Sequence, residues 1–298
     1  MDILLVTATA MEMRAVLSGL PGEAARAEGS SRTGANGEDL PEALKAPVAP
    51  GVAALPLVLP AGSCRLHPLV CGIGPINAAF ALGGRLRLTD QPDGKPFFAA
   101  VLNMGIAGTY DPDRLPLGSL AVASAEIWPE YGLADAGHVN AAGLGFAQAF
   151  YRGRRVVERI ELASKEVLGS LGLGWHTPPL DCPAVTVAGC SGSPVQARNM
   201  QERTQGLMEN MEGFALALGC LQYENGLGAP GVDGSAGTGP SGAGIAGRFS
   251  GSEAQGLPVL PFVEVRSISN VAGRRPPEGW DMPAALKALS QAAKELFA

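Results

Sequence analysis

Short runs of consecutive apolar residues alternate with segments of helical periodicity along most of the chain. The first run, at residues 3–7, has no polar alternation, as expected for a central parallel strand covered on both faces. Further runs that predict strands lie at 67–71, 97–102, 120–125, 184–188 and 259–265. The pattern therefore predicts an α/β protein with a central, mixed but mostly parallel sheet flanked by helices.

Helical periodicity fills several of the segments between these runs. Residues 9–20 carry an apolar stripe, and Thr9 followed by Glu12 has the spacing of a capping box. The same spacing of apolar side chains predicts helices at 78–88, 156–171, 207–220 and 283–297.

Two stretches interrupt this alternation. Residues 21–60 are rich in Gly, Pro, Ala and charged residues, with a periodic pattern only at 52–59, which predicts an edge strand. Residues 226–256 contain 11 glycines, a composition that cannot build a packed core. We therefore expect one domain over residues 1–298 with two variable insertions, the second of them flexible.

Composition narrows the class of protein. The net charge of -6 and the sequence pI of about 5.2 leave no basic field for nucleic acid. The five cysteines form no C-x-x-C pair, which favours reduced thiols in the cytoplasm. The amino terminus lacks the basic region of a signal peptide, and no apolar run is long enough to span a bilayer. A metal site and a membrane partner are not expected either.

Two acids, Glu212 and Glu12, each have both a structural and a functional interpretation. Glu212 lies in the apolar segment 207–220, where a carboxylate needs a partner; it is either a helix-surface acid or an acceptor for the hydroxyls of a polyol such as ribose. Glu12 is either a helix cap or a group at the carboxyl end of the first strand, where open α/β sheets bind ligands.

Glycine-rich turns follow two of the predicted strands. Residues 72–77, G-I-G-P-I-N, lead into a helix and place backbone N–H groups where they can bind an anion or a polar ligand. Asn77 replaces the third glycine of the dinucleotide fingerprint, so no nicotinamide or flavin cofactor is expected. Residues 103–109 are small and allow backbone to approach a ligand closely.

Five motifs in order along the chain carry a resemblance to one superfamily. They are the first strand leading to Glu12, C-G-I-G-P-I-N at 71–77, N-M-G-I-A-G at 103–108, M-E at 211–212 and V-R-S-I-S-N at 265–270. This set resembles the purine nucleoside phosphorylases and nucleosidases. Within them, the opening V-T-A-T and the closing I-S-N with a following Gly273 and Arg274 most resemble the futalosine hydrolases of menaquinone biosynthesis.

The resemblance implies a three-layer phosphorylase/nucleosidase-like fold and assigns roles by position. It implies that Glu12 activates the attacking water, that Glu212 binds the ribose with Met211 against the sugar, and that Asn270 meets the leaving base. The remaining substrate-binding residues that it implies are Ile106, Ala107, Gly108 and Ser269. It further implies a nucleoside substrate, no cofactor, and a homodimer or larger homo-oligomer.

The side chain of Asn270 favours one leaving base. Its amide NH2 group can donate to both N7 and O6 of a 6-oxopurine, whereas a 6-aminopurine presents a donor at N6. Futalosine hydrolysis would release hypoxanthine, a 6-oxopurine, together with dehypoxanthine futalosine. The alternative for Asn270 is a turn residue at the end of a strand.

Several functions stay open at this point. A carboxylate at the position of the nucleophile repels phosphate and so favours hydrolysis over phosphorolysis. A 6-oxopurine nucleoside phosphorylase and a methylthioadenosine/adenosylhomocysteine nucleosidase are the enzyme alternatives. A nucleoside-binding protein without catalysis is the alternative from another class.

Overall fold

A computed structural model of the chain describes residues 1–21, 53–54, 58–89, 96–135, 138–151, 154–223 and 260–298. The insertion predicted at 226–256, and most of the one at 21–60, lie outside these residues. None of the described helices is long and apolar enough to cross a membrane.

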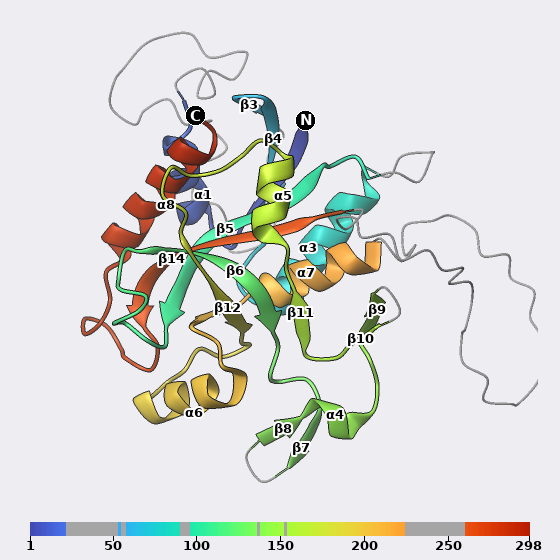
Figure 1. Cartoon of the computed structure of the whole chain (residues 1–298), viewed down its shortest axis with the longest axis vertical. Coiled ribbons are helices and arrows are strands. Elements are labelled where there is room, and N and C mark those ends of the chain that lie inside the picture. Colours follow the sequence, from blue (N-terminus) through green and yellow to red (C-terminus); the bar gives the residue numbers. More distant parts are fainter. Residues whose placement is uncertain (22–52, 55–57, 90–95, 136–137, 152–153, 224–259) are drawn as a thin grey trace, which may run out of the picture.

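Ten of the described strands form one mixed sheet (Figure 1). They are β1 (Asp2–Thr7), β2 (Ala53–Ala54), β3 (Leu59–Ala61), β4 (Cys64–Val70), β5 (Ala100–Thr109), β6 (Leu120–Ile127), β11 (Arg159–Glu161), β12 (Leu180–Thr186), β13 (Met208–Asn210) and β14 (Phe262–Val271). The long pairings, such as β1 with β4 and β14 with β5, are parallel, whereas the short pairings of β2, β3 and β11 are antiparallel. Two small hairpins lie beside the sheet, β7 (Leu133–Asp135) with β8 (His138–Asn140) and β9 (Ala149–Tyr151) with β10 (Arg154–Val156).

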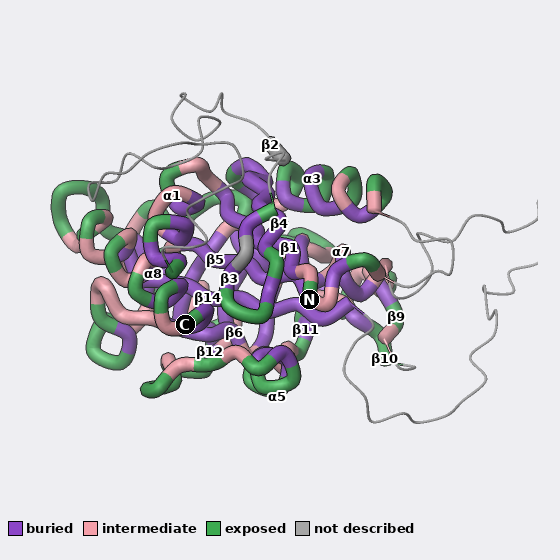
Figure 2. The backbone as a smooth tube through the Cα atoms, turned by 90° about the horizontal axis from the view of Figure 1, so that it is seen from above, coloured by how far each residue is buried: buried purple, intermediate pink, exposed green. Residues whose placement is uncertain are grey.

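Helices cover both faces of the sheet. They are α1 (Ala10–Ser18), α3 (Pro75–Arg87), α4 (Ala141–Leu144), α5 (Ser164–Ser170), α6 (Pro194–Thr204), α7 (Gly213–Gln222) and α8 (Met282–Leu296). One hydrophobic core joins α1, α5 and α8 to the sheet, and a second joins α3 and α7 to its other face. The strands between these layers are buried along most of their length (Figure 2). The predicted α/β class with a central mixed sheet is confirmed.

Three local predictions were wrong. Residues 156–171 form no continuous helix: β10 ends at Val156, β11 pairs with β6, and only α5 is helical. The segment 207–220 begins as β13, and its helix starts only at Gly213. The small residues 103–109 continue β5 rather than follow it. In each case hydrogen bonds to a neighbouring strand decide the local structure, because the apolar spacing of a short segment fits either form.

Candidate active site

Glu12 lies in the first turn of α1, directly after β1. Its Oε2 accepts hydrogen bonds from the backbone N and the hydroxyl of Thr9, at 2.8 and 2.7 Å, so the capping box is confirmed. Its Oε1 accepts a hydrogen bond from the backbone N of Ile106 at 3.0 Å. Glu12 is 2% exposed. The cap therefore fixes one oxygen, while the other oxygen lies against β5.

Glu212 stands at the N-cap of α7 and is also buried. Its Oε1 accepts from the backbone N of Gly74, in the glycine-rich turn before α3, at 3.0 Å. Its Oε2 lies 3.4 Å from Nη1 of Arg266. Burial raises the pKa of Glu212, and the neighbouring Arg266 guanidinium opposes that shift.

Arg266 on β14 connects the two acids. Its Nη1 donates to the carbonyl of Ile106 at 3.2 Å, and the N–H of the same residue binds Glu12. A Cβ on Gly105 would stand 2.5 Å from this Nη1 and 3.0 Å from Oε1 of Glu12, so only glycine leaves room for both side chains. Glu12 and Glu212 therefore converge on one buried guanidinium, although 200 residues separate them in the sequence.

The guanidinium of Arg266 is held by a further acid. Its Nε donates to Oε1 of Glu264, two residues earlier on the same face of β14, at 2.6 Å. Burial works to lower the pKa of Arg266, but the carboxylates of Glu264, Glu212 and Glu12 raise it above its ordinary value. Arg266 is therefore charged and fully engaged.

Asn270 lies at the far end of β14, opposite Gly108 of β5. A Cβ on Gly108 would stand 2.9 Å from Nδ2 of Asn270 and 3.3 Å from Cγ of Glu209, so these two side chains lie over the same glycine. The hydroxyl of Ser269 donates to Oδ1 of Asn270 at 2.9 Å, which leaves the amide NH2 group of Asn270 as the donor toward a ligand.

The predicted residues thus form two groups along β5 and β14. Glu12, Ile106 and Glu212 surround Arg266. Further along the strands, Ala107 accepts a hydrogen bond from Ser269 at 3.3 Å, and Gly108 faces Asn270. The sulfur of Met211 lies 3.5 Å from that of Cys190, whose thiol is close enough to feel the charges of Glu209 and Glu212.

The sequence analysis missed three members of the site. Glu264 and Asn210 hold Arg266, and Glu209 lies beside Asn270. The sequence did contain a signal for Glu264 and Arg266. These two charged residues stand two positions apart in an otherwise apolar strand, so their side chains lie on the same face of it. Burial raises the pKa of Glu209, against hydrogen bonds from Ser191 and Tyr110.

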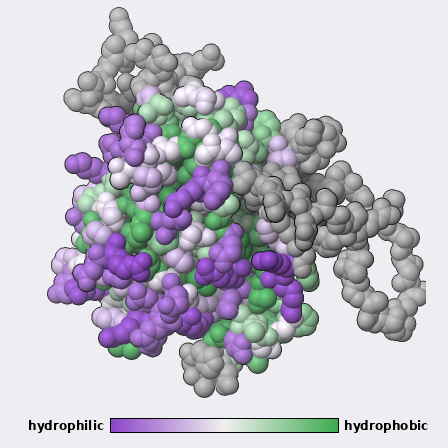
Figure 3. All heavy atoms as spheres, viewed as in Figure 1, coloured by the Kyte–Doolittle hydropathy of each residue, from purple (hydrophilic) through white to green (hydrophobic). Residues whose placement is uncertain are grey.

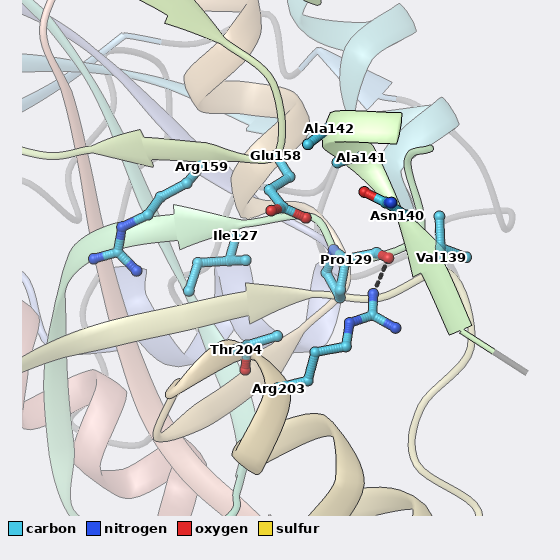
Figure 4. Close-up of a pocket in the computed structure, with 10 residues that line it drawn as sticks. All are labelled: Ile127, Pro129, Val139, Asn140, Ala141, Ala142, Glu158, Arg159, Arg203 and Thr204. Atoms are coloured by element: carbon cyan, nitrogen blue, oxygen red, sulfur yellow. Dashed lines mark hydrogen bonds between the residues drawn. The ribbon is translucent and has the colours of Figure 1, made fainter. Parts of the chain in front are cut away.

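A pocket of about 340 Å³ lies elsewhere (Figure 4). It is lined by Ile127, Pro129, Val139, Asn140, Ala141, Ala142, Glu158, Arg159, Arg203 and Thr204. Arg203 donates to the carbonyl of Pro129 across it. None of the residues predicted to bind the ribose or the base lines this pocket.

Comparison with known proteins was made in sequence and in structure. No family model matches the chain. Two curated relatives do: the futalosine hydrolase of Thermus thermophilus is 29% identical over 232 residues, 77% of this chain and 80% of the relative. The futalosine hydrolase of Streptomyces coelicolor is 28% identical over 232 residues, which make up 76% of this chain and 77% of the relative. The chain is a relative of the futalosine hydrolases.

Solved structures agree with this relationship at the level of the fold. A methylthioadenosine/adenosylhomocysteine nucleosidase from Colwellia psychrerythraea, solved with adenine, matches with a TM-score of 0.59 at 16% identity over 99% of this chain and 92% of its own. The native futalosine hydrolase of Helicobacter pylori matches with a TM-score of 0.56 at 14% identity over 99% and 94%. The chain therefore has the nucleosidase fold. Its likeness to the two curated futalosine hydrolases supports an N-glycosyl hydrolase.

Proposed function

We propose that the chain hydrolyses the N-glycosidic bond of futalosine to hypoxanthine and dehypoxanthine futalosine, in the cytoplasm, as a step of menaquinone biosynthesis. The convergence of Glu12 and Glu212 on Arg266, which stands on the same strand β14 as Asn270, carries this proposal. Both curated relatives bear the name futalosine hydrolase.

In the proposed chemistry, each group of residues stabilises one of the two charges that develop during the reaction. Cleavage develops positive charge on the ribose and negative charge on the leaving purine. Glu212 would accept the ribose hydroxyls and stabilise the positive charge, while Glu12 would take a proton from the attacking water. Within the part of the chain that the structure describes, Oε1 of Glu12 accepts a hydrogen bond from Ile106 alone, which leaves a lone pair for the proton of that water.

Hydrolysis is favoured over phosphorolysis by the charges around Arg266. A phosphate would need an available cation, but the Arg266 guanidinium already contacts Glu264 and Glu212. The carboxylate of Glu12 would also repel a phosphate dianion.

Base release measured with and without phosphate tests the proposal. Purified protein with futalosine should release hypoxanthine at the same rate in both buffers, as followed by liquid chromatography. Release that requires phosphate and yields a sugar phosphate would instead support a nucleoside phosphorylase. Binding of futalosine without release would support a nucleoside-binding protein.

Asn270→Asp should shift the preference toward a 6-amino analogue of futalosine. The side chain would then accept from N6, or carry a proton to N7, whereas the amide of Asn270 only donates to N7 and O6. We expect the ratio of kcat/KM for the two substrates to change by about tenfold or more. An unchanged ratio in steady-state kinetics would refute the role of Asn270 in reading the base. It would also reopen the adenosylhomocysteine-type alternative.

The carboxylate end of futalosine needs a cation, for which the sequence offers Arg198, Arg203 and Arg266 as candidates. Arg266 is buried among carboxylates, and Arg203 is bonded to Pro129, whereas the role of Arg198 stays a prediction. Arg275 is a further candidate, because its Nη2 lies 3.4 Å from the Cβ position of Gly192 and its charge opposes the rise that burial causes in the pKa of Glu209.

A homo-oligomer stays a prediction, and the surface of α3 favours it. Ile76 and Phe80 are 83% and 77% exposed, and Ile73 before the helix is 56% exposed. Figure 2 shows α3 as an outer helix with exposed turns, while Figure 3 shows polar and apolar side chains intermixed on the face of Figure 1. Three exposed apolar residues at helical spacing are suited to contact with a second copy.

A further inference from the structure

A second pair of acids is buried behind the proposed ribose site. Glu126 on β6 and Glu264 on β14 are both 0% exposed, and their carboxyl groups lie next to each other. Oε1 of Glu126 and Oε2 of Glu264 both point at Cα of Gly213, where a Cβ would collide with each of them. The chemistry proposed above uses neither acid.

The partners of the two acids differ in charge. Glu264 accepts from the Arg266 guanidinium, a charged donor. Glu126 accepts only from neutral donors, the hydroxyl of Thr186 at 2.6 Å and the amide NH2 of Asn210 at 2.7 Å. Burial and the neighbouring Glu264 carboxylate raise the pKa of Glu126 well above its ordinary value. Of the two, Glu126 is the better site for a proton.

Oε2 of Glu264 supplies independent evidence for that proton. This oxygen is buried and has no donor among the described residues. A buried carboxylate oxygen without a donor is costly. A proton on Oε1 of Glu126 would be donated to it and would also remove the repulsion between the two carboxylates.

Glu126 is connected to Glu212 through Asn210. Oδ1 of Asn210 accepts from the backbone N–H groups of Glu212 and Gly213 at 2.9 and 2.8 Å, and its Nδ2 donates to Glu126. Nη2 of Arg266 also donates to Oδ1 of Asn210 at 3.3 Å. The orientation of the Asn210 amide, and with it the start of α7, therefore depends on Glu126.

Thr186 makes a second connection of the same kind. Its hydroxyl donates to Glu126 and accepts from the backbone N–H of Phe214 at 2.7 Å. The N–H groups at the start of α7 are thus satisfied by two side chains that both bind Glu126, and Glu212 is the N-cap residue of this helix.

We propose that Glu126 and Glu264 form a buried acid pair that shares one proton, carried by Glu126, and that this pair positions Glu212 for the ribose through Asn210 and Arg266. Among the described residues, the groups that face Glu126 are Glu264 from β14, Thr186 from β12 and Asn210 from β13. Behind them lie Arg266, which contacts Glu264 and Asn210, and Glu212, whose backbone N–H contacts Asn210. Only the last step, the contact of Glu212 with ribose, rests on the proposed function.

The pH dependence of unfolding tests the proton without any substrate. In the unfolded chain Glu126 loses its proton near its ordinary pKa, whereas in the folded protein it keeps the proton to higher pH. Its contribution to stability is therefore lost as the pH rises above that ordinary value. Glu126→Gln should abolish this loss. The unfolding temperature of the variant relative to the wild type should therefore increase from pH 5 to pH 9. Glu161→Gln, at an exposed acid on β11, is the matched control and should keep the wild-type slope.

Kinetics with futalosine test the positioning. Glu126→Gln should raise KM by about threefold or less, because its amide still donates to Glu264. Glu264→Gln should raise KM by about tenfold or more, with a smaller change in kcat, because Arg266 loses its ionised partner and binds Glu212 more tightly. The two variants are nearly isosteric with the acids they replace, so a purely structural role predicts equal effects.

The outcomes separate this inference from the proposed function. The proposal of a shared proton would be contradicted if the unfolding temperature of Glu126→Gln depended on pH as that of the wild type does. Equal increases of KM in the two variants would contradict it as well. If Glu264→Gln does not fold, the slope of Glu126→Gln decides alone. Should the slope disappear as expected while futalosine is not cleaved, the acid pair stands and the proposed substrate fails.

Discussion

Glu12→Gln should lower kcat for futalosine hydrolysis by about three orders of magnitude, as expected for the loss of a general base. An amide cannot accept the proton of the attacking water, although glutamine preserves the capping box with Thr9. Hypoxanthine should still bind with nearly the wild-type affinity, because in the proposed mechanism Glu12 acts on the sugar side of the site and not on the base. Single-turnover kinetics and calorimetry with hypoxanthine measure the two effects.

A matched control separates catalysis from helix capping. Glu166 is an exposed acid in the first turn of α5, and Glu166→Gln likewise removes a negative charge from a helix N-terminus. It should leave kcat unchanged. Substantial residual turnover in Glu12→Gln would exclude Glu12 as the base and leave it as a cap alone.

Arg266→Met should lower the free energy of unfolding by about 3–5 kcal/mol, the usual cost of removing one partner of a buried ion pair. Arg266 is 1% exposed, and its loss leaves the 0% exposed Glu264 and the buried Glu212 without their cation. Urea denaturation measures the change. The exposed pair of Arg159 with Glu161 offers the control, and Arg159→Met should change stability by no more than about 1 kcal/mol.

Equal effects of Arg266→Met and Arg159→Met would contradict the buried ion network. A variant that is destabilised but keeps the wild-type KM would contradict the contact of Arg266 with the substrate-binding form of Glu212. The two measurements therefore test the structural and the functional part of the network separately.

The sequence predicted the layers of the fold better than its short segments. Long apolar strands such as β1 and the C-terminal helix α8 are decided by local pattern, and they lie where they were predicted. The segment 156–171 was wrong because three-residue strands like β11 owe their structure to pairing partners distant in the sequence. The same holds for β13, which pairs with β12 and β5.

The site was predicted through single residues rather than through its network. Glu12, Glu212 and Asn270 could be named from motifs, because each follows a recognisable strand or turn. Arg266 was taken for one of several candidates to bind the far end of the substrate, and its burial shows another role. That role depends on Glu264 and on Gly105 of another strand, a combination that no local pattern contains.

The most direct test of the central claim is a crystal structure of Glu12→Gln with futalosine bound. The account predicts that the ribose hydroxyls lie within hydrogen-bond distance of Glu212 and that N7 and O6 of the base face the amide of Asn270. A nucleoside bound instead in the pocket beside Arg203 and Pro129, with Glu212 and Asn270 out of its reach, would contradict it.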